Sequence, residues 1–357
     1  MKKKLMQWTY FLDILGYGEE QKNIDSQEKA DAFINFMKGS KYLIEGQEQQ
    51  DKLFYKDKEY DIYDYYEVKT VFISDSFVIT VIPKENLFDE DDYYYFSTFI
   101  IMELTFKIFI LLEYVLKEKG LFFRGGISNK FTDIDTENLL AVGKGLIEAY
   151  SLESKFANVP RILLSKDILN DTKIMSSFLT HSKKYSENFS IFKKDKDNFY
   201  YLDYLGYMLS FLNKSERNRL SIQNELEDKY SINEELIKKL QKLPFSNKLN
   251  ENINILQKFF KENNISDEKS KKISELLKDS EGILSKYKDI VKNIQIVKKT
   301  TIETLDYFKV NVSTNLINYS GSEKINEKYS WLSKYLNESI SLFPDLDFIQ
   351  QYKIKNN

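Results

Sequence analysis

Asp13 is an acidic residue in an otherwise apolar stretch, so its position calls for a chemical explanation. It lies in the run Tyr10-Phe-Leu-Asp-Ile-Leu-Gly16, where the neighbouring side chains are aromatic or aliphatic. A buried carboxylate is costly unless it is paired or bound to a cation. Gly16 and Gly18 then let the chain turn tightly with backbone N–H groups exposed, which suits phosphate oxygens. Taken alone, Asp13 is equally compatible with two roles: a carboxylate that binds a cation, and a carboxylate that caps the turn.

A second acidic residue, Asp75, lies between two apolar segments, Tyr65–Ile73 and Phe77–Ile82. Their β-branched and aromatic content predicts a hairpin with Asp75 in its turn. An aspartate in a turn is common and by itself indicates no chemistry. If the hairpin lies beside the strand that carries Asp13, the two carboxylates converge and repel each other unless a divalent cation joins them. Hard oxygen ligands suit Mg²⁺ or Mn²⁺.

The elements that must position these residues follow the order β-α-β-β-α-β, and then a further β-α-β. The predicted strands are Gln7–Leu15, Tyr65–Ile73, Phe77–Ile82, Leu121–Ile127, Leu139–Val142 and Pro160–Ser165, and the predicted helices are Ser26–Ile44, Phe96–Lys119 and Gly143–Ala157. The first six elements predict an α+β fold of the split βαβ, or ferredoxin-like, plan. In such a sheet the first strand and the hairpin are neighbours, which would bring Asp13 and Asp75 to one edge.

The second half of the chain has a different character. Residues 213–338 are rich in Lys, Glu, Asn, Ile and Leu, with little strand signal. Helical periodicity is present in Ser231–Leu243, Asn250–Asn263, Asp267–Leu276 and Lys286–Tyr307. We therefore expect a catalytic domain over residues 1–212 and an α-helical C-terminal domain over residues 213–357. The segment 328–336 holds one of the two tryptophans and could dock back on the first domain.

Composition excludes several classes of function. The formal net charge is −3, so no basic excess indicates a nucleic acid or an anionic membrane as partner. The chain has no cysteine, which excludes disulfides and thiolate metal sites. The single histidine, His181, has polar neighbours and is interpreted as an exposed loop residue. The most apolar run, Phe96–Leu116, carries Glu103 and Lys107 at helical spacing, which favours a buried soluble helix. A cytoplasmic protein without a membrane segment is the expectation.

Two further blocks complete an ordered set of motifs. Phe122-Phe-Arg-Gly-Gly-Ile-Ser is followed by Gly143-Lys-Gly-Leu-Ile-Glu-Ala-Tyr-Ser-Leu-Glu153. The order Phe-x-Asp-Ile-x-Gly, Ser-Asp-Ser, Arg-Gly-Gly-Ile and Gly-x-x-Leu-Ile-x-Ala-x-x-Leu-Glu resembles the class III adenylate and guanylate cyclase domains. Within that class the chain looks most like the bacterial anti-phage pyrimidine cyclases of Pycsar systems. The resemblance spans about Trp8–Ser165.

The resemblance implies a palm-type cyclase domain with two-metal chemistry. Asp13, Asp75 and the backbone carbonyl of Ile14 would hold two Mg²⁺ or Mn²⁺ ions, one activating the ribose 3′-hydroxyl and the other binding the triphosphate. Backbone N–H groups of Leu15 and Gly16 would cradle phosphate. Arg124 is the basic residue expected near the site, with a sheet-end ion pair as its alternative role. The substrate would be UTP or CTP, and the cyclic product a defence signal read by a separate cyclic-nucleotide-binding effector.

The chain departs from the family at the residues that handle ribose and base. Adenylate cyclases carry an Asn and an Arg where this chain has Ile147 and Ser151, and their adenine-reading Lys and Asp fall near Val71 and Leu140. The absence of the adenine-reading Lys and Asp is compatible with recognition of another base, such as uracil or cytosine. The residues that could substitute for the missing groups are Lys144, Tyr150, Lys155 and Arg161. The family completes its site across a homodimer, so the face of Ile147, Tyr150 and Ser151 would lie at a dimer seam.

Two other functions remain open at the level of sequence. A cyclase-like domain that has lost turnover would bind a nucleotide or a protein partner as a sensor, which the identities of Ile147 and Ser151 favour. A palm-fold polymerase that makes a linear or cyclic oligonucleotide would use the same pair of carboxylates. Nothing in residues 213–357 carries recognisable chemistry.

Overall fold

The structure is a computed structural model that describes residues 2–46, 53–230 and 283–355, with a few single positions between 235 and 266. The chain divides into two compact units, Met1–Ser210 with Thr301–Asn357, and Phe211–Thr300. The sequence places residues 301–357 in the C-terminal domain, whereas this division groups them with the first unit. The predicted helices Ser231–Leu243, Asn250–Asn263 and Asp267–Leu276 lie outside the described residues except for single positions.

A seven-stranded, mainly antiparallel sheet is the central layer of the first unit, in the order β12-β13-β11-β8-β2-β6-β5. The strands are β2 (Trp8–Leu15), β5 (Tyr66–Ile73), β6 (Ser76–Pro83), β8 (Phe122–Ser128), β11 (Ile162–Leu164), β12 (Phe192–Lys194) and β13 (Tyr200–Leu202). Strand β2 pairs antiparallel with both β6 and β8, and β11 runs parallel to β8. The strand and hairpin that carry Asp13 and Asp75 are therefore neighbours, as predicted.

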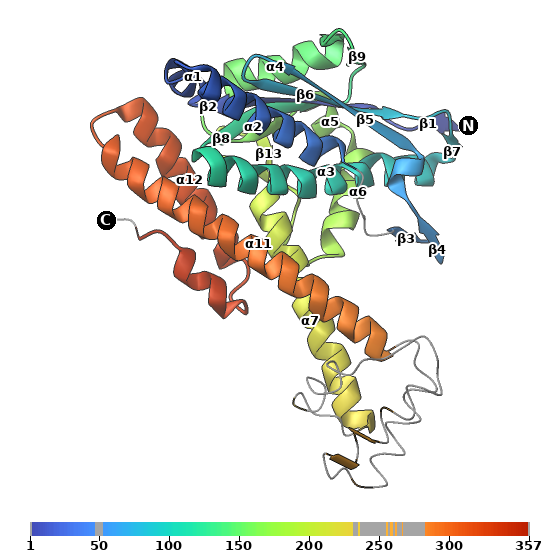
Figure 1. The fold of residues 1–357 in the computed structure, drawn as a ribbon. Coiled ribbons are helices and arrows are strands. Elements are labelled where there is room, and N and C mark those ends of the chain that lie inside the picture. Colours follow the sequence, from blue (N-terminus) through green and yellow to red (C-terminus); the bar gives the residue numbers. More distant parts are fainter. Residues whose placement is uncertain are drawn as a thin grey trace. The chain divides into compact units, whose positions relative to one another are not determined.

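Helices cover both faces of this sheet, and the fold is α+β (Figure 1). The longer helices of the first unit are α2 (Gln27–Glu45), α3 (Glu90–Lys119), α4 (Lys144–Phe156) and α12 (Glu323–Ser341), while α7 (Tyr204–Tyr230) and α11 (Ile283–Asn318) each belong partly to it. Helices α2 and α3 lie on one face and α4 lies on the other (Figure 1). The helix limits follow from capping: Ser26 accepts a hydrogen bond from the N–H of Lys29, and Gly120 ends α3 with a φ of 66°.

Alternation along β2 decides which side chains reach which helices. The indole of Trp8 donates a hydrogen bond of 2.7 Å to the carbonyl of Ser97 in α3. On the opposite face, the ring of Phe11 packs against that of Tyr150 in α4, with centroids 5.2 Å apart. Because side chains two residues apart on a strand share a face, Asp13 lies on the α4 side with Phe11. This helix can approach closely because a Cβ at Gly126 would collide with the backbone of α4.

Several short elements were not predicted. They are the hairpin β3 (Leu53–Tyr55) with β4 (Lys58–Tyr60), strand β9 (Asp133–Asp135), the pair β1 (Lys3–Lys4) with β7 (Leu87–Phe88), helices α1 (Tyr17–Lys22), α5 (Lys166–Asn170) and α6 (Thr172–Lys183), and 3₁₀ turns η1 (Ile62–Asp64) and η2 (Asp347–Tyr352). The predicted short strand Leu139–Val142 is present as β10 (Leu140–Val142), which pairs with β9 in a separate two-stranded sheet. The polar stretch Ser182–Lys196 contains the end of α6 and the edge strand β12.

His181 was predicted wrongly as an exposed loop residue. It lies in α6 and is 1 % exposed, because the ring packs between α6 and α3. Its Nε2 atom lies 3.0 Å from the carbonyl oxygen of Tyr95 and 3.1 Å from the hydroxyl of Thr98. Burial lowers the pKa of His181 to about 3. Histidine at this position is therefore a neutral core residue.

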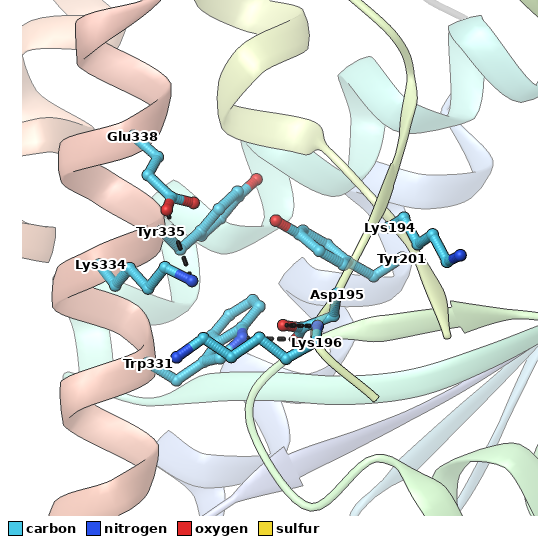
Figure 2. Close-up of a pocket in the computed structure, with 8 residues that line it drawn as sticks. All are labelled: Lys194, Asp195, Lys196, Tyr201, Trp331, Lys334, Tyr335 and Glu338. Carbon is cyan, nitrogen blue, oxygen red and sulfur yellow. Dashed lines mark hydrogen bonds and ion pairs between the residues drawn. The ribbon is translucent and has the colours of Figure 1, made fainter. Parts of the chain in front are cut away.

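The C-terminal helix α12 docks on the sheet edge through its aromatic side chains, as expected for the segment 328–336 (Figure 2). Trp331 donates a hydrogen bond of 2.8 Å from its indole to Asp195, in the turn after β12. The hydroxyl of Tyr335 donates a bond of 2.9 Å to Asp203 and accepts one from the N–H of Leu205. These buried contacts fix α12 relative to the sheet. Among the described helices, none is long and apolar enough to cross a membrane.

Candidate active site

Asp13 and Asp75 come together at one end of the sheet through backbone pairing. Asp13 on β2 is the register partner of Ser76, the residue directly after Asp75. The N–H of Ile14 donates a hydrogen bond of 3.1 Å to the carbonyl oxygen of Asp75. The turn that carries Asp75 is sharp, with Ser74 at a φ of 60°. The two carboxylates are thus held close by main-chain geometry.

The electrostatics of Asp13 show that the two carboxylates interact. Burial raises the pKa of Asp13, and the hydrogen bond and positive charge of Arg124 lower it. The nearby carboxylate of Asp75 raises it again, and the net shift is upward. A cation bound beside Asp13 would offset this repulsion and favour the ionised carboxylate.

Arg124 is the cation that balances this acidic site in the protein alone. Its Nε atom lies 3.0 Å from Oδ2 of Asp13 and 2.6 Å from Oε1 of Glu153 in α4. Arg124 on β8 is the register partner of Asp13 on β2, so the ion pair spans two hydrogen-bonded strands. The guanidinium therefore lies beside Asp13, and it forms the sheet-end ion pair that was its alternative role.

Glu153 is a third acidic residue of the site and was given no role from the sequence. Burial raises its pKa to about 7, with Asp13 and Asp75 adding to the rise and Arg124 opposing it. The signal that could have identified it is the pair Leu152-Glu153 on the buried side of α4, next to Ala149. A glutamate on an inward helix face requires a partner, and the strand arginine is that partner.

The donor set of the site suits a hard divalent cation. Two carboxylates that converge at a strand end, beside a backbone carbonyl, are ligands that Mg²⁺ and Mn²⁺ accept. Throughout residues 2–46, 53–230 and 283–355, no group of three or more His, Cys, Asp or Glu side chains is arranged to hold a metal ion. The predicted set of Asp13, Ile14 and Asp75 contains only two side-chain ligands. These residues fit an ion that takes further ligands from a nucleotide.

The turn after β2 contains Leu15 and Gly16, whose main chain is predicted to contact phosphate. Leu15 ends the strand, and Gly16 has a φ of 90°, a conformation that favours glycine. Helix α1 begins directly afterwards at Tyr17. It has six residues, so its dipole adds little. The negative charge of Asp75 contributes to a raised pKa of Tyr17, which places this turn beside the carboxylates.

Ile147 and Ser151 lie on α4, the helix that also carries Glu153. Ile147 is 66 % exposed, and four further exposed apolar side chains lie on α4 or in the segment of the chain just before it. These are Phe131, Leu140, Val142 and Tyr150. We call these five residues the α4 patch. An exposed apolar cluster of this kind marks an interaction surface more often than scattered single residues do.

Val71, which the sequence aligned with an adenine-reading residue, is apart from the site. Its side chain is 0 % exposed and packs with Phe11, Val78 and Ala149 in one core cluster. The strand that carries it points this residue into the layer beneath α4, so the side chain presents no surface to a ligand. Arg161 is also committed elsewhere: its guanidinium is buried in ion pairs with Asp195 and Asp197. Lys144 and Lys155 are exposed on α4.

Neither a protein-family model nor a curated protein matches this chain. Among solved structures, the chain is similar to the adenylyl cyclase CyaB from P. aeruginosa, with 12 % sequence identity and a TM-score of 0.33. The match covers 57 % of this chain and 95 % of that one. A likeness at this identity and TM-score is too distant to assign an activity.

Proposed function

We propose that this protein is a nucleotidyl cyclase that converts a nucleoside triphosphate to its 3′,5′-cyclic monophosphate and pyrophosphate. The observation that carries the proposal is the convergence of Asp13 and Asp75 at the end of β2, fixed by the Ile14–Asp75 backbone hydrogen bond. The strand order β8-β2-β6-β5, with α2 and α3 on one face, supports a ferredoxin-like, palm-type domain. The ordered motifs between Trp8 and Ser165 agree with it.

In this proposal the chain's own residues bind and orient the substrate. Asp13, Asp75 and the carbonyl of Ile14 hold two Mg²⁺ or Mn²⁺ ions, which supply charge neutralisation of the triphosphate and a lowered pKa for the attacking hydroxyl. Leu15 and Gly16 donate backbone N–H groups to phosphate oxygens. Arg124 orients Asp13 and Glu153 and adds positive charge where charge builds up on the phosphates.

The bond changes of the proposed reaction balance without a further reactant. The ribose 3′-oxygen forms a bond to the α-phosphorus while the bond from that phosphorus to the oxygen bridging to the β-phosphate breaks. The hydroxyl proton passes to solvent, and pyrophosphate leaves in line with the attack. The protein's contribution is therefore positioning and charge stabilisation.

Three finer parts of the proposal rest on the resemblance. The first is a pyrimidine substrate, UTP or CTP, since the chain lacks the Lys and Asp with which adenylate cyclases read adenine. The second is a homodimer formed through the α4 patch, which would bring Ile147 and Ser151 of one copy to the nucleotide of the other. The third is a cytoplasmic role in anti-phage defence, with a separate effector that binds the cyclic product.

The function is tested by incubating the purified protein with each of the four ribonucleoside triphosphates and Mn²⁺. Mass spectrometry should detect a cyclic mononucleotide and an equal amount of pyrophosphate, from UTP or CTP in preference to ATP and GTP. Asp75→Asn should give none. Absence of any product from a folded protein with all four substrates would contradict the proposal, and a cyclic purine product would contradict only the pyrimidine preference.

The ion pairs of Arg124 favour one alternative, a nucleotide sensor that has lost turnover. Because Asp13 already has an internal cation, metal must compete with Arg124 for this carboxylate. A sensor would bind nucleotide and return it unchanged, and Asp75→Asn would weaken binding with no activity to lose. A palm-type oligonucleotide synthase would instead give products longer than one nucleotide on anion-exchange chromatography.

A further inference from the structure

The inward face of α12 carries a lysine, Lys328. The side chains of α12 that are buried against the sheet include Leu332, Tyr335, Leu336 and Ser339. Lys328 precedes Leu332 by four residues and Tyr335 by seven, a spacing that places all three on one stripe of the helix. It is half-buried, unlike Lys324 and Lys334, which are exposed. Lysine on the packed face of a helix is uncommon unless an anion accompanies it.

The packing of α12 brings Lys328 to the end of the sheet that holds the candidate site. The neighbouring ring, that of Tyr329, lies 6.4 Å from the ring of Phe122 on β8. Phe122 is two residues before Arg124, so both side chains leave the strand on the same face. Their register partners on β2 are Leu15 and Asp13. The first turns of α12 therefore lie beside the face that presents Asp13 and Arg124.

Lys328 has no anionic partner within the part of the chain that the structure describes. No hydrogen bond or ion pair is formed by its ammonium group there. Burial lowers the pKa of Lys328, the positive charges of Arg124 and Lys324 lower it further, and Asp13 acts in the opposite direction. An unpaired ammonium beside a guanidinium is unfavourable in the protein alone. An anion placed between Lys328 and Arg124 would remove this repulsion.

The anchoring of α12 makes Lys328 a positioned group rather than a mobile surface lysine. Trp331, one turn after Lys328, is hydrogen-bonded to Asp195 (Figure 2). Asp195 is in turn paired with the buried Arg161. Tyr335, one turn further, is bonded to Asp203, a carboxylate that is 0 % exposed. Contacts of this kind hold a binding group in place before the ligand arrives, which lowers the entropic cost of binding.

We propose that Lys328 binds the polyphosphate chain of the nucleotide together with Arg124, as a cationic contact contributed by the C-terminal helix. The inference rests on the proposed function, in which Asp13 and Asp75 hold the metal-bound phosphates. It supplies positive charge that the uncharged Ile147 and Ser151 do not provide. Lys328 donates hydrogen bonds to phosphate oxygens and neutralises the charge that leaves with pyrophosphate. No proton transfer from the lysine is required.

The direct test is calorimetric titration of the full chain with inorganic tripolyphosphate in the presence of Mn²⁺. Wild-type protein should bind it, and Lys328→Ala should weaken binding by about tenfold, the value of one charge-assisted hydrogen bond. Lys328→Arg should retain most of the affinity, because it keeps the charge. The matched control is Lys334→Ala, which removes an exposed lysine from the same helix and should bind like wild type. Binding of uridine should be unaffected by each substitution.

Two results would overturn the inference: wild-type protein that does not bind tripolyphosphate, or a folded Lys328→Ala variant that binds it as tightly as wild type does. Lys328→Met separates a binding role from a packing role, since replacing an unpaired half-buried charge by an apolar group should raise Tm in the absence of ligand. A fall in Tm would assign Lys328 to packing instead. If affinity depends on Lys328 but no nucleoside triphosphate is converted, the proposed cyclase activity fails while the polyphosphate contact stands.

Discussion

The N–H of Ile14 donates a hydrogen bond of 3.1 Å to the carbonyl oxygen of Asp75, joining the end of β2 to the turn between β5 and β6. This main-chain bond fixes the separation of Asp13 and Asp75 in the absence of any ligand. The protein therefore maintains two acidic side chains in proximity by its backbone alone, and Arg124 is the internal cation that offsets them. A site of this type is organised before it binds metal or nucleotide.

Arg124→Ala should make the fold depend on divalent metal. The substitution leaves Asp13, Asp75 and Glu153 without their internal cation, and removal of one member of a largely buried ion pair costs about 3 kcal/mol. We expect a lower Tm in EDTA and a larger upward shift on addition of Mn²⁺ than wild type shows. Thermal unfolding with and without Mn²⁺ measures both effects.

The control for this prediction is Lys173→Ala, which removes an ion pair with Glu90 in which both side chains are more than half exposed. An exposed ion pair contributes little to stability, so the Tm of Lys173→Ala should stay close to that of wild type with or without Mn²⁺. An Arg124→Ala variant with wild-type stability in EDTA would show that the three carboxylates do not need the guanidinium.

Ile147→Glu should prevent self-association through the α4 patch. The patch exposes Phe131, Leu140, Val142, Ile147 and Tyr150, and a charge at its centre would have to be desolvated in any interface. Size-exclusion chromatography with light scattering should find a dimer for wild type and a monomer for the variant. The same change at Ile317, which is 75 % exposed on α11, should leave the dimer intact. A wild-type monomer at all concentrations would exclude the dimer.

Acid should destabilise the protein through His181. Its pKa falls from 6.5 to about 3 on folding because the ring is buried. Below pH 6.5 the unfolded chain therefore binds a proton that the folded protein does not, so stability decreases as the pH is lowered. Between pH 7.5 and 5.5 this single group should remove about 1.4 kcal/mol from the free energy of unfolding.

The measurement for this prediction is urea unfolding of wild type and His181→Gln at several pH values. Glu153, with a pKa of about 7, also titrates in this window and acts in the opposite direction, so the prediction concerns the difference between the two proteins. Relative to His181→Gln, wild type should lose about 1.4 kcal/mol between pH 7.5 and 5.5. The two proteins are compared by the slope of the free energy of unfolding against pH. A packing cost of the substitution that does not depend on pH leaves this slope unchanged. Identical slopes for the two proteins would contradict a neutral, buried His181.

Tyr335→Phe should loosen the docking of α12. The lost hydroxyl donates to Asp203 and accepts from the N–H of Leu205, and both partners are buried. Leaving two buried polar groups without this partner should cost about 2 kcal/mol of stability. Tyr319→Phe, at a residue that is 41 % exposed, is the control and should have little effect. Equal urea midpoints for the two variants would contradict an anchoring role for Tyr335.

The sequence predicted the parts of the fold that depend on local chemistry. A serine side chain can cap the start of a helix, and glycine readily adopts the left-handed conformation that ends one. The structure places Ser26 at the start of α2 and Gly120 at the end of α3. The turn at Asp75 was predicted from the apolar segments on either side of it. The proximity of Asp13 to Asp75 followed from the order of the helices and strands, because that order restricts which strands pair.

Residues whose roles depend on distant packing were not predictable in the same way. Polar neighbours in the sequence placed His181 in a loop, but its ring is buried against α3, which lies far from it along the chain. The role of Lys328 depends on α12 returning to the sheet, and no local pattern marks its approach to Arg124. Val71 was aligned with a base-reading residue, whereas pairing with Val78 across the β5–β6 hairpin places it in the core.

The central claim is that Asp13 and Asp75 form a metal-dependent nucleotide site, and Mn²⁺ binding tests it most directly. Electron paramagnetic resonance should detect Mn²⁺ bound to wild-type protein together with a non-hydrolysable nucleoside triphosphate, and Asp13→Asn or Asp75→Asn should lower the affinity by at least about tenfold. Asp25→Asn, at an exposed carboxylate, should bind Mn²⁺ like wild type. Unchanged Mn²⁺ affinity in folded Asp13→Asn and Asp75→Asn variants would contradict the account.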